Sequence, residues 1–157
     1  MSDELTLRPV RLSDAFSLQQ NCWPGRPLTE VQAHLSRLLK WHEKGRGWGL
    51  VSLIRSRIVG FGQLTLWGRR AEICNLVVSE GWRGRGAGTA LIRGLLKIAR
   101  EQGIPEVEIG AAVSNPRALA LYRRLGFHDR YRMLLDLGNG PELVIYLSLR
   151  PGDGDSS

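Results

Sequence analysis

The segment NLVVSEGWRGRGAG, residues 75–88, constrains this chain more than any other stretch. Its apolar start is typical of a β-strand, and the residues after it are typical of a helix start. The first amides of a helix lack partners within the helix and carry the positive end of its dipole, and glycines let a ligand approach them closely. Four glycines and two arginines stand at this junction: Gly81, Arg83, Gly84, Arg85, Gly86 and Gly88. The segment therefore predicts a strand, a loop and a helix whose backbone amides cradle a pyrophosphate group.

Two better-known phosphate-binding motifs do not fit this segment. A dinucleotide fingerprint would need a third glycine at position 89, where the chain has Thr89. A P-loop needs lysine and then serine or threonine after its last glycine, whereas Ala87 follows Gly86. A mobile surface turn is the structural alternative to a phosphate cradle.

The composition is that of one globular domain. The chain has 157 residues, of which 43% are hydrophobic, and a formal net charge of +7. We expect one domain over residues 1–150 and a disordered tail over 151–157. The positive charge suggests an anionic partner, but the arginines are spread along the chain, which argues against a nucleic-acid partner.

Several classes of protein are excluded by what the sequence lacks. Two cysteines make neither a disulfide framework nor a metal cluster. There is no apolar run of about 18 residues or more, so we expect no transmembrane helix and no membrane partner. The acidic start MSDELTL is unlike a signal peptide. We therefore expect a cytoplasmic protein without a metal site.

The hydrophobic pattern predicts an α/β fold. Alternation and apolar runs indicate strands at about 5–10, 48–54, 58–67, 72–78, 107–113, 127–135 and 143–149. Helical spacing and stop signals indicate helices at about 13–22, 29–45, 86–102 and 114–126. The order strand, long helix, strand in the middle of the chain predicts two neighbouring parallel strands.

Local signals predict the ends of these elements. Ser13 and Asp14 are typical of a helix N-cap, and Thr29 with Gln32 fits a capping box. Asn115 followed by a proline predicts the start of the last helix. The short segment Arg55–Arg57 predicts a hairpin between two strands.

Two motifs together resemble the GNAT superfamily of N-acetyltransferases. Residues 83–88, RGRGAG, match the superfamily pattern Arg/Gln-x-x-Gly-x-Gly/Ala, and the preceding NLVV resembles its fourth strand. Residues 115–127, NPRALALYRRLGF, resemble its second signature, with the asparagine, the tyrosine and the final Gly-Phe. The resemblance covers roughly residues 5–149. One departure is Glu80, where many relatives carry proline; it alters the turn and leaves the cradle unchanged.

The resemblance implies a particular sheet and a cosubstrate. The implied fold is a single-domain GNAT-like fold with a mixed, mostly antiparallel sheet of about seven strands and helices on both faces. Strands 72–78 and 107–113 would be parallel and would splay apart to admit acetyl coenzyme A (acetyl-CoA). Unpaired backbone groups would then bind the pantetheine arm. The implied cofactor-binding residues are Leu76, Val77 and Val78 for the arm, Arg83, Gly84, Arg85, Gly86, Ala87 and Gly88 for the pyrophosphate, and Asn115 near the arm.

The resemblance also implies the chemistry of transfer. An amide near Val78 would stabilise the oxyanion of the acetyl carbonyl. Tyr122 would protonate the departing thiolate; by periodicity alone it is an ordinary half-buried tyrosine. An amine must lose a proton before it attacks, and Glu72 is the predicted general base, with Glu108 in reserve. The structural alternative for Glu72 is a solvated carboxylate at a sheet edge, and for Asn115 a helix cap with no ligand.

The remaining reactive residues receive no catalytic role. His34, His42 and His128 lie outside both motifs and are interpreted as surface or packing residues. Cys74 is interpreted as a small residue of a buried strand. Arg69 and Arg70, beside Glu72, are expected to keep that carboxylate charged, which counts against its role as a base.

The function that follows is acetyl transfer from acetyl-CoA to a primary amine, on a small molecule or a protein, by direct attack in a ternary complex. A non-catalytic module that binds acyl-CoA is the alternative. The sequence does not identify the acceptor amine; Trp23, Trp41 and the loop 136–142 are candidates to line its site. A homodimer is left open.

Overall fold

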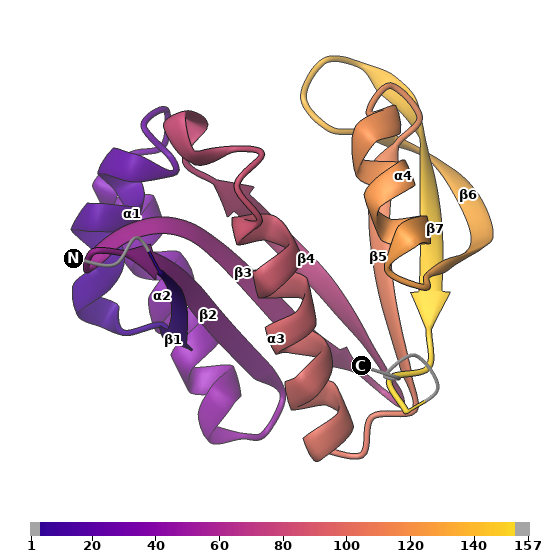
Figure 1. Cartoon of the computed structure of the whole chain (residues 1–157), viewed down its shortest axis with the longest axis horizontal. Coiled ribbons are helices and arrows are strands. Elements are labelled where there is room, and N and C mark those ends of the chain that lie inside the picture. The colour runs from indigo at the N-terminus through magenta and orange to yellow at the C-terminus, as the bar shows by residue number, and fades with distance from the viewer. Residues whose placement is uncertain (1–3, 153–157) are drawn as a thin grey trace.

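One seven-stranded sheet forms the centre of the molecule (Figure 1). The structure is a computed structural model that describes residues 4–152. The strand order is β1-β2-β3-β4-β5-β7-β6, and only β4 and β5 pair in parallel. The strands are β1 (Leu5–Pro9), β2 (Gly47–Ile54), β3 (Arg57–Trp67), β4 (Arg70–Val78), β5 (Glu106–Ala112), β6 (His128–Asp136) and β7 (Pro141–Leu149). The predicted α/β class and mixed, mostly antiparallel sheet are confirmed.

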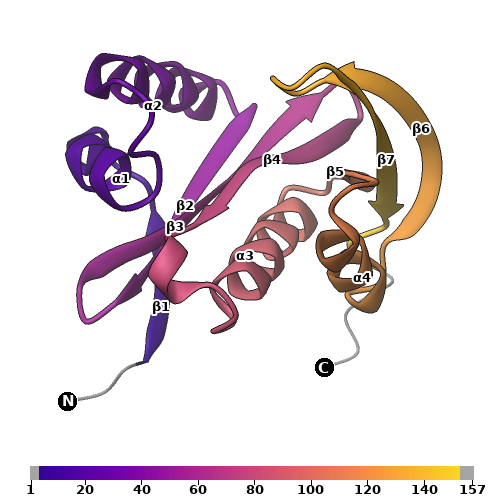
Figure 2. The same cartoon turned by 90° about the horizontal axis from the view of Figure 1, so that it is seen from above.

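Helices cover both faces of this sheet, as predicted (Figure 2). The α-helices are α1 (Ala15–Asn21), α2 (Leu28–Glu43), α3 (Ala87–Glu101) and α4 (Pro116–Arg124), with 3₁₀ turns η1 (Leu12–Asp14) and η2 (Glu80–Trp82). α1 and α2 lie on one face of the sheet, and α3 and α4 lie on the other. Each helix turns an apolar stripe to the sheet; in α3 Leu91, Ile92 and Leu95 have no exposed surface.

β4 and β5 pair over only part of their length. Arg70–Ile73 of β4 faces Glu106–Ile109 of β5, and the pairing ends there. Beyond Ile109, β5 stays paired with β7, while β4 stays paired with β3. The two parallel strands meet at one end and diverge toward the other (Figure 1). The predicted splay is therefore present.

A β-bulge in β4 marks the point where the strands separate. The register of β3 with β4 shifts between Gln63, which faces Cys74, and Phe61, which faces Val77. Asn75, inside the bulge, has a φ of 54°, in the left-handed region that asparagine tolerates better than most residues. Bulges bend a strand and re-aim its side chains, often beside an active site. This bulge bends β4 away from β5.

Asp14 stands at the N-cap position of α1, as predicted, but the predicted capping box at Thr29 is wrong. Asp14 makes no side-chain cap for α1; its carboxylate instead accepts a hydrogen bond from the Arg11 N–H at 2.7 Å and two from the Arg8 guanidinium at 2.8 Å. α2 begins at Leu28 after an extended Pro27, so Thr29 lies inside the helix and forms no capping box. Asn115 does cap α4, accepting a hydrogen bond from the Ala118 N–H at 3.3 Å. The N-cap residue itself has a non-helical backbone, and the sequence alone did not show that this residue is Pro27 in α2.

The chain end beyond Leu149 is only partly described. Pro151 is buried and forms a turn with Gly152, so the predicted disordered tail does not begin at residue 151. The rest of that predicted tail lies outside the described residues. Within residues 4–152, none of the helices has the length and apolar character that spanning a membrane requires.

Candidate functional site

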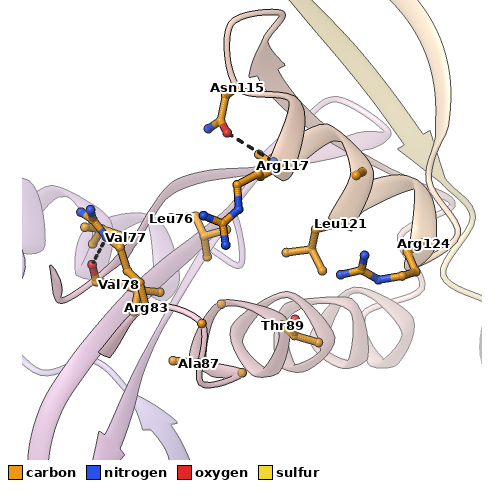
Figure 3. A pocket seen from close by; sticks show the side chains of 15 residues that line it. Leu76, Val77, Val78, Arg83, Ala87, Thr89, Asn115, Arg117, Leu121 and Arg124 are labelled. Carbon is orange, nitrogen blue, oxygen red and sulfur yellow. Dashed lines mark hydrogen bonds between the residues drawn. The ribbon is translucent and has the colours of Figure 1, made fainter. Parts of the chain in front are cut away.

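A cleft of about 710 Å³ opens where β4 leaves β5, between the N-terminal end of α3 and the side of α4 (Figure 3). Three parts of the chain line it: the end of β4 (the β4 wall), the turn before α3 with the first residues of that helix (the α3 turn), and one side of α4 with Asn115 before it (the α4 wall). The lining residues are Leu76, Val77, Val78, Arg83, Gly84, Gly86, Ala87, Gly88, Thr89, Asn115, Arg117, Ala118, Ala120, Leu121 and Arg124. Nine of the ten residues predicted to bind a cofactor are in this set; Arg85 is not. The structure thus brings together two motifs that are separated by about thirty residues in the sequence.

Glycines with positive φ shape the turn before α3. Gly86 is the N-cap of α3, with a φ of 85°, and Gly84 has a φ of 79°. An L side chain rarely adopts such a φ, which explains glycine at both positions. Apart from the glycine and its chain neighbours, no atom of the described residues lies within 4 Å of where a Cβ of either glycine would be, so the backbone there faces open space. The helix amides after Gly86 are therefore accessible to a ligand in the cleft.

The two arginines of the glycine motif behave differently. Arg83 lines the cleft, and its Nε donates a hydrogen bond to the Val78 carbonyl at 3.3 Å. This bond ties the loop to the end of β4. The Arg85 guanidinium instead lies 5.0 Å from the ring centroid of Trp82, in a cation–π contact. Its side chain packs on the loop, and only its backbone remains a candidate for phosphate binding.

The α4 wall contains residues that the sequence motifs did not single out. Arg117, Leu121 and Arg124 are spaced by four and three residues, so they share one side of the helix, and all three line the cleft. Ala118 and Ala120 complete this wall. The helical spacing was readable from the sequence, but which side of α4 faces α3 was not. No hydrogen bond or ion pair within residues 4–152 engages the Arg117 or Arg124 guanidinium.

Tyr122 lies on the other side of α4, toward the core. It is 7% exposed, and its ring centroid lies 6.3 Å from that of Phe127. Burial raises the pKa of its phenol, so the hydroxyl stays protonated at neutral pH. It does not line the cleft as the structure stands, and no side-chain partner of its hydroxyl is present among the described residues. Its role as a proton donor stays a prediction.

Glu72 points to the opposite face of the sheet from the cleft. Its neighbours Ala71 and Ile73 pack in the core under α3, so alternation along β4 turns Glu72 toward the α2 side. The Trp67 indole N–H donates a hydrogen bond to its Oε1 at 3.3 Å. Burial raises the pKa of the Glu72 carboxyl; the Trp67 bond works against this, and the nearby Glu108 adds to it. A raised pKa makes a carboxylate a better base.

Glu108 is held much more tightly than Glu72. It is 7% exposed and faces Glu72 across the β4–β5 pair. Arg70 donates to its Oε2 at 2.7 Å, and the Tyr131 hydroxyl donates to its Oε1 at 3.0 Å. Both oxygens are therefore occupied. The expectation that Arg70 would hold Glu72 in its charged form is wrong, because Arg70 pairs with Glu108 instead.

A polar chain lies beside the β4 bulge, on the same face as Glu72. His34 of α2 is 9% exposed, and its Nε2 donates to the Gln63 Oε1 at 2.8 Å. Gln63 in turn donates to the Thr65 hydroxyl at 3.0 Å and accepts from Asn75 at 3.3 Å. Burial lowers the pKa of His34, which therefore stays neutral. His34 is thus no surface residue: it fixes the amide that holds Asn75 in the bulge.

A second cavity, of about 280 Å³, opens next to this chain. It is lined by His34, Arg37, Leu38, Trp41, Gln63 and Asn75. Trp41 also stands edge-on to Trp67, with 6.0 Å between the ring centroids, and Trp67 is the partner of Glu72. Of the aromatic residues proposed for the acceptor, Trp41 therefore lies near Glu72. Trp23 instead packs on His34 and Phe61.

The other reactive side chains do not form a site. Burial raises the pKa of both the Cys22 and Cys74 thiols to about 11, so neither is a thiolate at neutral pH. His42 contacts the Gly47 carbonyl at 3.2 Å, and His128 is exposed at the start of β6. Within the described residues, no three histidine, cysteine, aspartate or glutamate side chains are placed to hold a metal ion.

Comparison with known proteins agrees with this geometry. Residues 12–127 match the acetyltransferase (GNAT) family. The chain belongs to this family. Among curated relatives, it is 42% identical over 60 residues to an uncharacterised N-acetyltransferase of Methanocaldococcus jannaschii and 48% identical over 58 residues to the N-alpha-acetyltransferase MAK3 of Arabidopsis thaliana. Those segments are 38% and 37% of this chain but only 26% and 30% of the relatives, so the chain spans less than a third of their length.

Solved structures show the same GNAT fold over nearly the whole chain. RimL, a ribosomal-protein alpha-N-acetyltransferase in complex with coenzyme A, superposes with a TM-score of 0.83, 19% identity and coverage of 95% of both chains. The yncA protein of Salmonella typhimurium, with its cofactor acetyl-CoA, superposes with a TM-score of 0.78 and 19% identity over 98% of this chain and 99% of that one. The predicted membership and fold are confirmed.

Proposed function

We propose that this GNAT-family chain is an N-acetyltransferase that transfers an acetyl group from acetyl-CoA to a primary amine. The observation that carries this proposal is the cleft between β4 and β5, with free helix amides at one end and an unpaired strand edge along its side. Coenzyme A bound in RimL and acetyl-CoA bound in the yncA protein support the same cosubstrate here. N-acetyltransferases among the curated relatives support the reaction.

The amides from Arg83 to Gly88 bind the pyrophosphate, and the edge of β4 at Leu76–Val78 binds the pantetheine arm. A pyrophosphate is favoured at a helix N-terminus because the amides and the dipole both attract negative charge. The β4 edge beyond Ile73 has no β5 partner, so amides of the arm take the place of a strand. This directs the thioester toward the closed end of the splay, where β4 and β5 meet.

The acceptor amine enters from the face that carries Glu72. Cosubstrate and acceptor then approach through opposite faces of the sheet and meet in the gap between β4 and β5, which is the arrangement that direct attack requires. Glu72, which lies where β4 and β5 still pair, accepts the amine proton directly or through a water. A backbone amide at the Leu76 end of this unpaired β4 edge stabilises the oxyanion, rather than one near Val78 beside the pyrophosphate, and Tyr122 protonates the thiolate that leaves.

Acetylation of a panel of amines tests this proposal. The panel contains peptide N-termini, lysine side chains, polyamines and aminoglycosides, and release of free coenzyme A is measured with acetyl-CoA as donor. We expect amine-dependent release with at least one class, together with an acetylated product in the mass spectrum. Tight binding of coenzyme A with no acetylated product from any class would favour the non-catalytic acyl-CoA module instead.

Glu72→Gln tests the general base, with Glu108→Gln as the comparison. If Glu72 takes the proton, its loss lowers turnover at neutral pH, and turnover partly recovers as rising pH deprotonates the free amine, whose pKa is about 10. Glu108→Gln breaks the ion pair with Arg70 and therefore lowers stability, but keeps the shape of the pH profile. An unchanged pH profile in Glu72→Gln would assign the base elsewhere.

A further inference from the structure

The cavity of about 280 Å³ beside the β4 bulge has no part in the proposed binding of acetyl-CoA. Its helical lining comes from α2, which covers the face of the sheet opposite to α3 and α4 (Figure 2). The cavity and the cleft nevertheless come close at the bulge, because Asn75 lines the cavity and the next residue, Leu76, lines the cleft. The cavity therefore lies across β4 from the end of the cleft at which acetyl transfer is proposed, on the side from which the acceptor enters.

The floor of this cavity is a set of polar side chains that already have hydrogen-bond partners. The amide oxygen of the buried Gln63 accepts from His34 and Asn75. The Gln63 nitrogen donates to the Thr65 hydroxyl. The Arg26 guanidinium donates to the other ring nitrogen of the neutral His34, at 3.4 Å. These groups fix the shape of the floor and leave no charge there for a ligand.

Arg37 brings a positive charge to this cavity. Its side chain is exposed, and among residues 4–152 no hydrogen bond or ion pair engages it. Arg37 lies one helical turn before Trp41, which with Leu38 gives the cavity an apolar wall. A guanidinium binds a carboxylate through two parallel hydrogen bonds. An unpaired guanidinium beside an apolar wall therefore suits an anionic group on an organic ligand.

Glu72 has the opposite charge and is also without an ion pair among the described residues. It accepts a hydrogen bond from Trp67, and Trp67 stands edge-on to Trp41 at the cavity. Across the β3–β4 pair Glu72 faces Thr65, which is two residues from Gln63 of the cavity floor. Two residues of extended strand are about 7 Å long. An acceptor that reaches from Glu72 into the cavity therefore spans several ångströms.

We propose that Arg37 binds a carboxylate of the acceptor, and that the acceptors are primary amines with a carboxylate several bonds from the amine. The proposal rests on the proposed function, because it takes the amine to be acetylated beside Glu72. Two kinds of molecule have this chemistry: a peptide with an acidic side chain at its first or second residue, and an ω-amino carboxylate. The amine and carboxylate of a free α-amino acid share one carbon atom and lie too close together to reach both sites.

Matched acceptors that differ only in this carboxylate test the proposal. In one arm, tetrapeptide amides with Glu at the first or second residue are compared with the same peptides carrying Gln. In the other arm, 5-aminopentanoate is compared with 5-aminopentanamide. Release of coenzyme A gives kcat/KM for each. The wild type should favour the acid about ten- to a hundredfold in at least one arm, because a hydrogen bond between charged groups contributes roughly tenfold or more. High salt should reduce the preference, since Arg37 is exposed.

Substitution of Arg37 identifies the residue responsible. In Arg37→Gln, kcat/KM for the acid should fall to near that for the amide, and Arg37→Lys should keep part of the preference because it keeps the charge. Lys40→Gln is the matched control: it removes the same charge from the same helix, but Lys40 does not line the cavity. It should keep the wild-type preference. Circular dichroism verifies that each variant is folded.

Several results would overturn the proposal. Equal kcat/KM for acid and amide in both arms of the wild-type experiment would do so while leaving acetyl transfer intact, as would products formed only from amines without a carboxylate. An acid preference that persists in Arg37→Gln would assign the carboxylate to another residue. An equal loss for acid and amide in that variant would mean that Arg37 only shapes the cavity. The absence of product from every amine would overturn this proposal and the proposed function together.

Discussion

Substitution of Gly86 is expected to have two effects that can be measured separately: one on the stability of the protein and one on its affinity for coenzyme A. Its φ of 85° lies in the left-handed region, which costs an alanine roughly 1–2 kcal/mol. In a chain of this size we expect Gly86→Ala to lower the melting temperature by about 2–8 °C. Apart from its chain neighbours, no atom of the described residues lies within 4 Å of the new Cβ, so the substitution creates no clash with them in the free protein. Any further effect must come from the ligand.

Gly86 lines the cleft, so a Cβ there would take up space that the pyrophosphate is proposed to occupy. We therefore expect the affinity for coenzyme A to fall at least about tenfold, a loss of about 1.4 kcal/mol. Gly103→Ala is the matched control, because Gly103 lies just beyond the C-terminal end of α3 with a φ of 68° and also has no protein atom within 4 Å of its would-be Cβ. It should lose similar stability and bind coenzyme A as the wild type does.

A comparison of a charged with an uncharged side chain at position 86 distinguishes the electrostatic effect on ligand binding from the steric one. Asn and Asp have nearly the same shape, and both tolerate a positive φ better than other residues. Gly86→Asp should bind coenzyme A at least about tenfold more weakly than Gly86→Asn, because only Asp repels the pyrophosphate. Calorimetric titration measures the affinities, and thermal unfolding measures the stabilities. Wild-type affinity in a folded Gly86→Asp variant would refute the assignment of the α3 turn as a phosphate cradle.

Three further substitutions test other parts of the structure. Tyr122→Phe should lower turnover about 10²-fold or more while the affinity for coenzyme A stays nearly unchanged, because it removes only a proton donor. Asp14→Asn should lower the free energy of unfolding by about 1–3 kcal/mol near neutral pH, because it breaks the paired hydrogen bonds with the half-buried Arg8. Gly110→Ala should cost about 1–3 kcal/mol, because its Cβ would lie 2.8 Å from the Tyr146 ring and disturb the stack with Tyr131.

The effect of Asp14 should depend on pH with a definite sign. Burial acts to raise the pKa of its carboxyl, but the hydrogen bonds from Arg8 and the Arg11 N–H outweigh it, so the pKa in the folded state lies below its usual value. A lowered pKa contributes stability above the pKa of the unfolded state, about 3.9, and that contribution is lost as the pH falls through the folded-state pKa. Urea unfolding should therefore show the wild type and Asp14→Asn converging below about pH 4. A constant difference down to pH 2 would contradict this account.

The other two variants have their own decisive outcomes. Wild-type turnover in Tyr122→Phe would mean that water protonates the thiolate. Tyr122 lies outside the cleft lining, which is consistent with that alternative. An unchanged melting temperature in Gly110→Ala would mean that Tyr146 moves aside at no cost and that its stack with Tyr131 adds no stability.

The sequence by itself determined the local parts of this protein. The strand, glycine loop and helix around Gly86, the cap at Asn115 and the hairpin turn at Arg55–Ser56 all follow from preferences within a few neighbouring residues. Such preferences act over a few residues, so they were readable before the fold was known, although the same kind of signal failed at Thr29. The pairing of two motifs at the right distance then identified the family, and the family implied the splayed strands.

Only the tertiary structure decided what the side chains of the site do. Arg70 neighbours Glu72 in the chain but pairs with Glu108, which is 38 residues away. Glu72 owes its raised pKa first to its burial in the folded protein, and His34 reaches the β4 bulge through Gln63, 29 residues away. The side of α4 that lines the cleft, with Arg117 and Arg124, depends on how α4 packs against the sheet. Burial and long-range contacts set these charges, and neither exists until the chain has folded.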